Sequence, residues 1–359
     1  MTTLSRPELL RLRLANQSLT GTTATDPVDA VRALTALQGQ DLPGALYSVG
    51  LRMYGGGLST VRAALNRGDI VRSWPIRGTL HLLAPEDLSL ILPLTGARMI
   101  RGAAGRHRQL GITEADIQRC RGLALDALEG SPGLTRAGLF TLFEAAGQTT
   151  GGQRGIHLLW LLCLHGWLVQ GPMEGNNQLY VPYSRWIGPI PERHPGEALA
   201  ALALRYFRSH GPATERDFAW WSGLPLTQVR AAVAAVGDQL IEASYDSGTY
   251  LMAAGAAEAL AAGAAGSRSL LALPGFDEFL LGYADRSAPL DGAHAQRVTP
   301  GNNGVFRSTI VYAGRVIGTW RKPSGTRAAI DPEPFSSLSA GQRGAFDRAA
   351  GHYRRFVET

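Results

Sequence analysis

Lysine is nearly absent from this chain of 359 residues: Lys322 is the only one, and every other strongly basic side chain is an arginine. Enzymes that act through a Schiff base use a lysine amine, so that chemistry has a single candidate side chain here. Cysteine is also scarce. Cys120 and Cys163 are too few for a zinc site without help from histidine, and neither belongs to a Cys-x-x-Cys pair. We therefore predict two buried thiols, no metal and no cofactor.

Long hydrophobic runs are missing as well. No stretch reaches the roughly 18 apolar residues that a membrane-spanning helix requires. The first seven residues lack the apolar centre of a signal peptide. We expect a cytoplasmic monomer that contacts no membrane.

The chain contains enough apolar residues to form a hydrophobic core, and it carries a net positive charge. Apolar residues make up 45% and charged residues 18%, as in ordinary globular proteins. A chain of 359 residues exceeds what one hydrophobic core usually organises, so we expect at least two packed units. The formal net charge of +6 and the sequence pI of about 9.6 favour a polyanionic partner such as nucleic acid.

The most distinctive short stretch is Leu-Gln-Gly-Gln-Asp-Leu-Pro at 37–43. A helix is predicted over 27–37, with Asp26 as its cap and apolar residues at three-residue spacing on one face. That pattern turns Gln38 and Gln40 away from the core, and Gly39 makes continuation of the helix costly. Two carboxamides and the Asp41 carboxylate therefore gather at the end of a helix.

A pattern of helices followed by a β-hairpin occurs three times along the chain. The hairpins pair 70–76 with 79–83 across an Arg77-Gly78 turn, 167–170 with 178–181, and 241–243 with 249–251. The predicted helices before them span 4–16, 27–37, 42–53 and 58–67, then 113–129, 135–146 and 153–165, then 197–209, 214–221 and 227–236. Helices followed by a hairpin are typical of the winged helix, a variant of the helix-turn-helix.

The predicted fold is therefore α+β, mostly α, with tandem winged-helix domains. We place winged helix 1 at 1–108, winged helix 2 at 109–190 and winged helix 3 at 196–266. A small C-terminal β-hairpin region, 267–359, is expected to pack on winged helix 3, with a hairpin over 306–312 and 315–320. Three prolines within 189–196 indicate a linker, and the Ala-rich stretch 253–266 is either a helix or a loose connector.

In four blocks the chain resembles the winged-helix family that contains the AlkZ-type DNA glycosylases. The blocks are 36–41, 73–81, 274–286 and 314–321, and the likeness covers nearly the full length. The resemblance implies tandem winged helices bent around DNA. It also implies excision of alkylated purines, including bulky or cross-linked adducts of natural-product alkylators, in DNA repair or self-resistance. The Gln-aliphatic-Gln motif of that family corresponds to Gln38 and Gln40, and Gly39 stands where the family usually carries an aliphatic residue.

The implied chemistry is hydrolysis of an N-glycosidic bond. A purine alkylated at N7 or N3 is cationic and leaves as a neutral base, so the enzyme mainly positions a water and stabilises a cationic sugar. The amide oxygens of Gln38 and Gln40 can accept hydrogen bonds from that water. Asp41 is the candidate to stabilise the sugar or help deprotonate the water, and its alternative is a turn or helix cap. Attack by water predicts a monofunctional enzyme without AP lyase activity.

Contacts with double-stranded DNA are expected from arginines on turns and hairpins, because their forked guanidinium groups suit phosphate. His81 either faces the DNA or is a buried strand histidine. A cluster of four arginines at 98, 101, 106 and 108 adds positive charge. The predicted DNA-binding residues are Arg72, Arg77, His81, Arg286, Arg307 and Arg321.

Two other classes of protein compete with this hypothesis. A non-catalytic winged-helix protein, either a transcription regulator or a drug-sequestering factor, would bind duplex DNA without releasing a base. A hydrolase of another kind would need a Gly-x-Ser-x-Gly elbow, a His-Glu-x-x-His pair or a phosphate loop. The sequence contains none of these.

Overall fold

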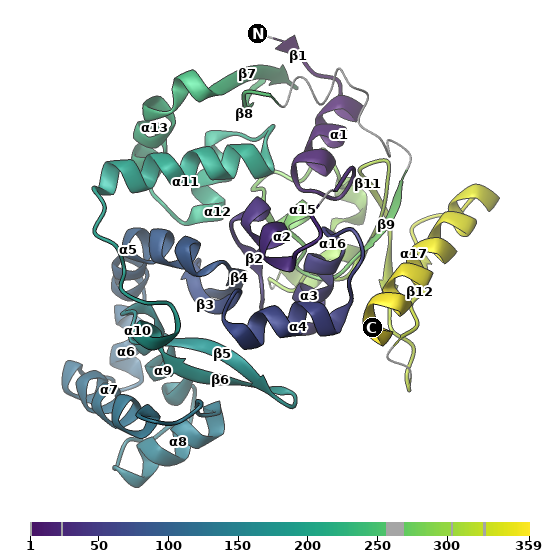
Figure 1. The fold of residues 1–359 in the computed structure, drawn as a ribbon. Helices are drawn as coiled ribbons and strands as arrows, with labels where there is room; N and C mark the ends of the chain where they lie inside the picture. Colours follow the sequence, from purple (N-terminus) through teal and green to yellow (C-terminus); the bar gives the residue numbers. More distant parts are fainter. Residues whose placement is uncertain (1, 23, 256–268, 303, 326–327) are drawn as a thin grey trace. The chain divides into compact units, whose positions relative to one another are not determined.

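The computed structural model describes all residues except 1, 23, 256–268, 303 and 326–327. Two compact units are present: unit 1 comprises Met1–Val61 and Leu199–Thr359, and unit 2 comprises Arg62–Ala198. As predicted, the fold is α+β; it contains more helix than strand, and its small sheets are largely antiparallel (Figure 1). Among the described residues, no helix has the length and apolar character needed to cross a bilayer. Most of the Ala-rich stretch 253–266 lies outside the described residues.

Unit 2 contains a hairpin, a group of helices and a second hairpin. Strands β4, β3, β5 and β6 follow one another in the sheet, and all neighbours among them are antiparallel. In sequence order the elements are α4 (Leu58–Arg67, shared with unit 1), β3 (Val71–Ile76), β4 (Thr79–Leu83), α5 (Pro85–Gly102), α6 (Ala104–Gln109), α7 (Glu114–Leu128), α8 (Arg136–Ala145), α9 (Arg154–Leu164), β5 (Leu168–Glu174), β6 (Asn177–Pro182) and α10 (Tyr183–Trp186).

Local sequence accounts for several of these boundaries. The side chains of Thr113 and Thr135 accept hydrogen bonds from backbone N–H groups in the first turns of α7 and α8, as expected of helix caps. Arg77 and Gly78 both have positive φ, 52° and 70°, as a two-residue hairpin turn requires. The predicted hairpin over 70–83 is confirmed. Strands β5 and β6 run further than expected, and helices α5 and α6 were not predicted.

The first part of unit 1 holds helices and a small sheet of order β1-β7-β8. Strand β1 (Thr2–Thr3) runs parallel to β7, a pairing that the sequence did not indicate. The remaining elements are α1 (Arg6–Asn16), α2 (Pro27–Leu34), β2 (Leu37–Gln38), α3 (Leu42–Gly50), α11 (Pro195–His210), α12 (Glu215–Ser222), α13 (Leu226–Ala235), the short η1 (Gly237–Gln239), β7 (Leu240–Tyr245) and β8 (Gly248–Ala253).

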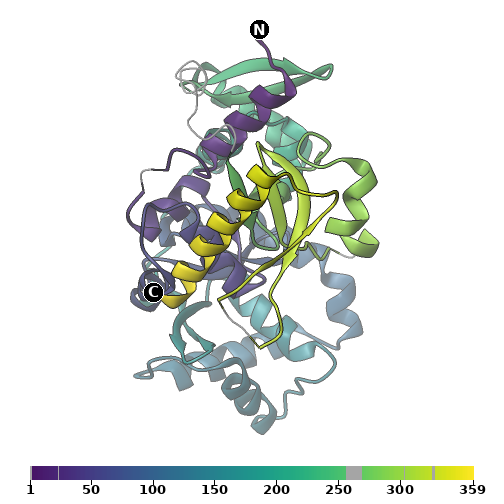
Figure 2. The ribbon, with the colours of Figure 1, turned by 90° about the vertical axis from the view of Figure 1, so that its right-hand side faces the viewer.

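The rest of unit 1 is an antiparallel sheet of order β12-β11-β10-β9 with helices beside it. The predicted hairpin is present as β10 and β11, which turn at Ala313 and Gly314. The tail is not only β structure, because a helix, α17, lies along β9 and buries Phe346, Tyr353 and Phe356 (Figures 1 and 2). The elements are β9 (Leu270–Leu273), α15 (Glu278–Leu281), η2 (Gly292–His294), α16 (Ala295–Val298), η3 (Pro300–Asn302), β10 (Thr309–Tyr312), β11 (Arg315–Arg321), β12 (Asp331–Pro334) and α17 (Ala340–Glu358).

Candidate active site in unit 1

The Gln-Gly-Gln stretch begins in a short strand rather than at a helix end. Helix α2 stops at Leu34 because Thr35 adopts φ 68° and ψ −50°, and residues 37–38 then form β2. Positive φ is unfavourable for a β-branched residue and costs about 1–3 kcal/mol. The prediction of a helix over 27–37 is therefore wrong in its last turn. The strained residue lies three positions before Gln38.

The two glutamines differ in burial. Gln38 is only 8% exposed, whereas Gln40 and Asp41 are exposed. The prediction that both glutamines face away from the core is wrong for Gln38, because the chain leaves α2 early and changes the direction of the residues that follow. The stretch presents one buried and one accessible carboxamide.

A buried carboxylate holds the main chain of the motif. The backbone N–H of Gln38 donates to Oε1 of Glu278 at 3.0 Å. The other oxygen, Oε2, accepts from Nε1 of Trp221 at 3.1 Å and lies 3.4 Å from Nε2 of His210. Glu278 has no exposed surface. Two N–H donors from distant parts of the chain converge on this one buried side chain, so Glu278 fixes the position of β2.

The histidine beside this carboxylate is held in one orientation. Burial lowers the pKa of His210, while its hydrogen bond to Glu278 opposes that shift. The net effect is a lowered pKa of His210, which favours the neutral ring. Its Nδ1 lies 2.8 Å from the hydroxyl of Ser209, and its ring stacks on Tyr206. The ring of His210, which contacts Glu278, is therefore held in place by Ser209 and by the aromatic ring of Tyr206.

A buried ion pair ties α3 to the same segment. Arg52 donates from Nη1 to Oδ2 and from Nη2 to Oδ1 of Asp277, both at 2.9 Å. Although burial raises the pKa of Asp277, the guanidinium of Arg52, the hydroxyl of Ser48 and the N–H of Phe279 together hold it below its usual range. Arg52 also donates to the carbonyl of Gln17 at 2.9 Å. The end of α1, the end of α3 and the start of α15 are thereby joined.

Asp41 occupies the N-cap position of α3 without acting as a side-chain cap. Its carboxylate accepts no cap hydrogen bond, and it lies over Gly44, where an added Cβ would come within 2.6 Å of Oδ2. The glycine thus leaves room for this side chain. Among the described residues, the Asp41 carboxylate forms no ion pair, so it remains an accessible anion next to Gln40.

The predicted DNA-binding residues of unit 2 are partly engaged within the fold. Arg72 donates from Nη1 to the side-chain oxygens of Gln170 and Gln178 at 2.9 and 3.1 Å. His81 is 0% exposed, and its Nδ1 lies 2.9 Å from the carbonyl of Thr79. Arg77 occupies the hairpin turn and is half-buried.

The predicted DNA-binding residues of unit 1 also differ in environment. Arg286 is mostly buried, which lowers its pKa, and its guanidinium lies over the rings of Trp220 and Phe306 at 4.8 and 5.1 Å. Arg321 pairs with Glu333 at 3.1 Å and with Asp331 at 3.6 Å. Arg307 is exposed and forms no ion pair with any described residue.

Sequence reasoning assigned no role to Glu278, Arg52, His210 or Trp221. A signal was present in Phe276-Asp277-Glu278-Phe279, where two acidic residues stand inside an apolar run. Acidic residues are seldom fully buried unless they are paired, so such a run indicates acids with partners in the core. The identity of those partners depends on contacts between distant parts of the chain.

Comparison with known proteins identifies the family of the chain. Residues 31–356 match the family described as "DNA glycosylase AlkZ-like". The chain is 27% identical over 360 residues to an interstrand DNA cross-link repair glycosylase from Streptomyces sahachiroi, covering 96% of this chain and 94% of the relative. It is also similar to the solved structure of the DNA glycosylase AlkZ from Streptomyces sahachiroi, with a TM-score of 0.84, 25% identity, and coverage of 99% and 97% of the two chains. This chain belongs to the AlkZ-like DNA glycosylase family.

Proposed function

We propose that the chain is a monofunctional DNA glycosylase that hydrolyses the N-glycosidic bond of purines alkylated at N7 or N3. The observation that carries this proposal is the stretch 38–41, where two carboxamides and an accessible carboxylate follow one another on a main chain held by Glu278. A cationic purine is already a good leaving group. Orientation of a water and stabilisation of the sugar are then sufficient for catalysis.

Each side chain in this stretch has a separate role in the proposed reaction. The exposed amide of Gln40 accepts a hydrogen bond from the attacking water and directs it toward the anomeric carbon. The amide of Gln38 supplies the second contact from a less exposed position. The carboxylate of Asp41 offsets positive charge on the sugar and takes up the proton of the water.

The substrate range extends to large adducts in this proposal. The similar protein from Streptomyces sahachiroi is named as a glycosylase of interstrand cross-link repair. We extend that substrate class to this chain, since a cross-link through N7 of guanine is also a cationic N-alkylpurine. The same leaving-group argument therefore applies to the simple adduct and to the cross-link.

The test is incubation of the protein with a duplex that contains one N7-alkylguanine, followed by heating in alkali, which breaks the strand where a base has been lost. We expect breaks at the lesion that depend on the protein and none in the matched unmodified duplex. If no alkylated purine were released faster than it is lost spontaneously, the proposal would be wrong.

The absence of AP lyase activity is tested by borohydride trapping. Lys322 is the one lysine, and its Nζ lies 5.5 Å from the centroid of the Tyr353 ring, within reach of a cation–π contact. We expect no covalent adduct with DNA that carries an abasic site, because no lysine is assigned to the proposed site. Efficient trapping by the wild type but not by Lys322→Ala would contradict the monofunctional assignment.

We assign DNA binding to winged helices and to arginines on hairpin turns and helix surfaces. Arg77 on its hairpin turn and the exposed Arg307 are the first candidates, together with the exposed arginines at 98, 101, 106 and 108 on α5 and α6. If about six or more phosphates are neutralised, affinity for an undamaged duplex should fall about 1000-fold between roughly 50 and 200 mM salt. Binding measured by fluorescence anisotropy would show this fall. A flat salt response would overturn the phosphate contacts.

A further inference from the structure

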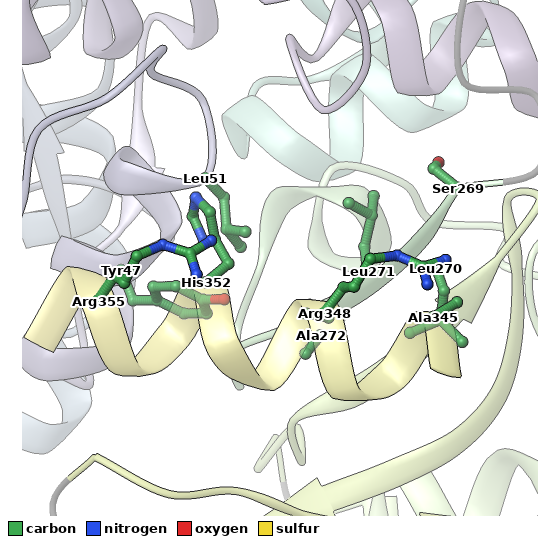
Figure 3. Close-up of a pocket in the computed structure, with 11 residues that line it drawn as sticks. Tyr47, Leu51, Ser269, Leu270, Leu271, Ala272, Ala345, Arg348, His352 and Arg355 are labelled. Atoms are coloured by element: carbon green, nitrogen blue, oxygen red, sulfur yellow. The ribbon is translucent and has the colours of Figure 1, made fainter. Parts of the chain in front are cut away.

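A pocket of about 390 Å³ lies in unit 1 between α3, β9 and α17. From α17 it is lined by residues 345, 348, 349, 352 and 355, whose spacing places them on one face of the helix. Tyr47 and Leu51 line it from α3 and the residue after it, and residues 270–272 line it from β9, with Ser269 directly before that strand (Figure 3). The volume falls within the range of small-molecule sites, roughly 300–1,000 Å³.

Positive charge dominates the pocket. Arg348 and Arg355 line it one turn on either side of His352, and no carboxylate is among the lining residues. Within the part of the chain that the structure describes, neither arginine forms an ion pair, and both side chains are exposed. Figure 3 shows Arg355, His352 and Tyr47 together at one end, with Arg348 near Leu270 toward the other. Two uncompensated guanidinium groups on one helix face suit a doubly charged anion.

Three buried polar atoms at the same place have no hydrogen-bond partner among the described residues. They are the hydroxyl of Tyr47, the hydroxyl of Ser269 and Nδ1 of His352. Tyr47 is only 2% exposed, and burial raises the pKa of its phenol, which therefore stays protonated and able to donate. Burial and the neighbouring Arg355 lower the pKa of His352. Buried polar groups are normally hydrogen-bonded, so buried polar groups that line a pocket without a partner indicate a binding site for a polar ligand.

The remaining lining residues are apolar, and they indicate that an organic group is attached to the anion. Leu51, Leu271 and Ala272 present hydrocarbon to the pocket, as do Ala345 and Ala349 of α17. A bare inorganic ion would leave this surface uncovered. A compact organic group attached to the anion would cover it and gain the free energy of apolar burial.

We propose that this pocket binds a phosphate monoester whose phosphate is held by Arg355 and His352, with the exposed side chain of Arg348 turning toward it from the other end of the pocket, and whose organic body rests on the apolar wall. Two sources of that chemistry exist: a free phosphate monoester, and the 5′-phosphate at the end of a DNA strand. Both present a dianion with an attached organic group. Neither needs glycosylase activity for binding, so the failure of this proposal leaves the proposed function untouched.

The test measures binding of phenyl phosphate by calorimetry to the full chain and to Arg348→Gln, Arg355→Gln and the double variant. Each single change should weaken binding about tenfold or more, and the double change should abolish it. Arg354→Gln is the matched control, because Arg354 is an exposed arginine of α17 that does not line the pocket. Thermal melting of every variant confirms that the fold is retained.

A second arm distinguishes the two sources. Affinity is compared for an undamaged duplex with and without a 5′-phosphate, in the wild type and in the double variant. A preference for the phosphorylated duplex that the double variant loses identifies the DNA end as the ligand. Binding of phenyl phosphate without such a preference identifies a free ester. If neither probe is bound through Arg348 and Arg355, or if Arg354→Gln weakens binding equally, the proposal is overturned.

Discussion

Alanine at position 38 or 40 is expected to slow release of N7-alkylguanine by about 100-fold or more at saturating enzyme. Gln38 and Gln40 are proposed to direct one water between them, so either change removes one of its two fixed acceptors. The loss should appear in the single-turnover rate constant and not in the affinity for DNA. Strand breaks after alkali treatment, followed over time, give that rate.

A surface glutamine provides the control for this experiment. Gln228 is exposed on α13, and Gln228→Ala should leave the rate unchanged. Because Gln38 is 8% exposed and Gln40 is exposed, only Gln38→Ala should also lower the melting temperature. Undiminished base release by the double variant Gln38→Ala, Gln40→Ala would remove the basis of the proposed mechanism.

Arg52→Met is expected to lower the free energy of unfolding by about 3–5 kcal/mol. The substitution leaves the Asp277 carboxylate buried without its cation, since Arg52 is 0% exposed and donates to Asp277 from both terminal nitrogens, Nη1 and Nη2. Urea denaturation at neutral pH measures the difference. Arg230→Met is the matched control, because Arg230 is exposed, its partner Glu215 is only half-buried, and the pair should contribute less than about 1 kcal/mol.

The effect of Arg52→Met should depend on pH in a defined direction. In the wild type the pKa of Asp277 is lowered, so the stability from this pair is present above the unfolded-state pKa of about 4 and is lost as the pH falls through the folded-state value. Without Arg52, burial is opposed only by the hydrogen bonds from Ser48 and Phe279, so the pKa of Asp277 should lie above its wild-type value. The two proteins should therefore approach one another in stability on acidification. A difference that is constant from neutral to strongly acidic pH would contradict this explanation.

Local patterns in the sequence predicted most helices and the hairpins because caps and turns are decided by neighbouring residues. Thr113, Thr135 and the Arg77-Gly78 turn are examples. Helix α17 was missed, because glycine at 341, 344 and 351 interrupts its pattern and only three of its side chains are buried. Packing along β9 explains a helix there better than intrinsic propensity does.

The candidate site was only partly predictable for a related reason. Gln38, Gln40 and Asp41 were found because they are contiguous and because the chain resembles a known family. Glu278 was not, since its contact with Gln38 joins residues 240 positions apart. The burial of Gln38 follows from Thr35, whose positive φ no propensity rule predicts for threonine.

Unit 1 is built from two separate segments of the chain, so the candidate site can assemble only late in synthesis. Residues 1–61 are synthesised first, but their partner Glu278 emerges only after all of unit 2. At roughly 5–20 residues per second, the delay is on the order of ten seconds or more. Early folding of unit 2 would shorten the effective loop between the two segments and ease their late association. A nascent chain that stops before residue 278 should thus contain a folded unit 2 and a strand β2 that lacks its contact with Glu278.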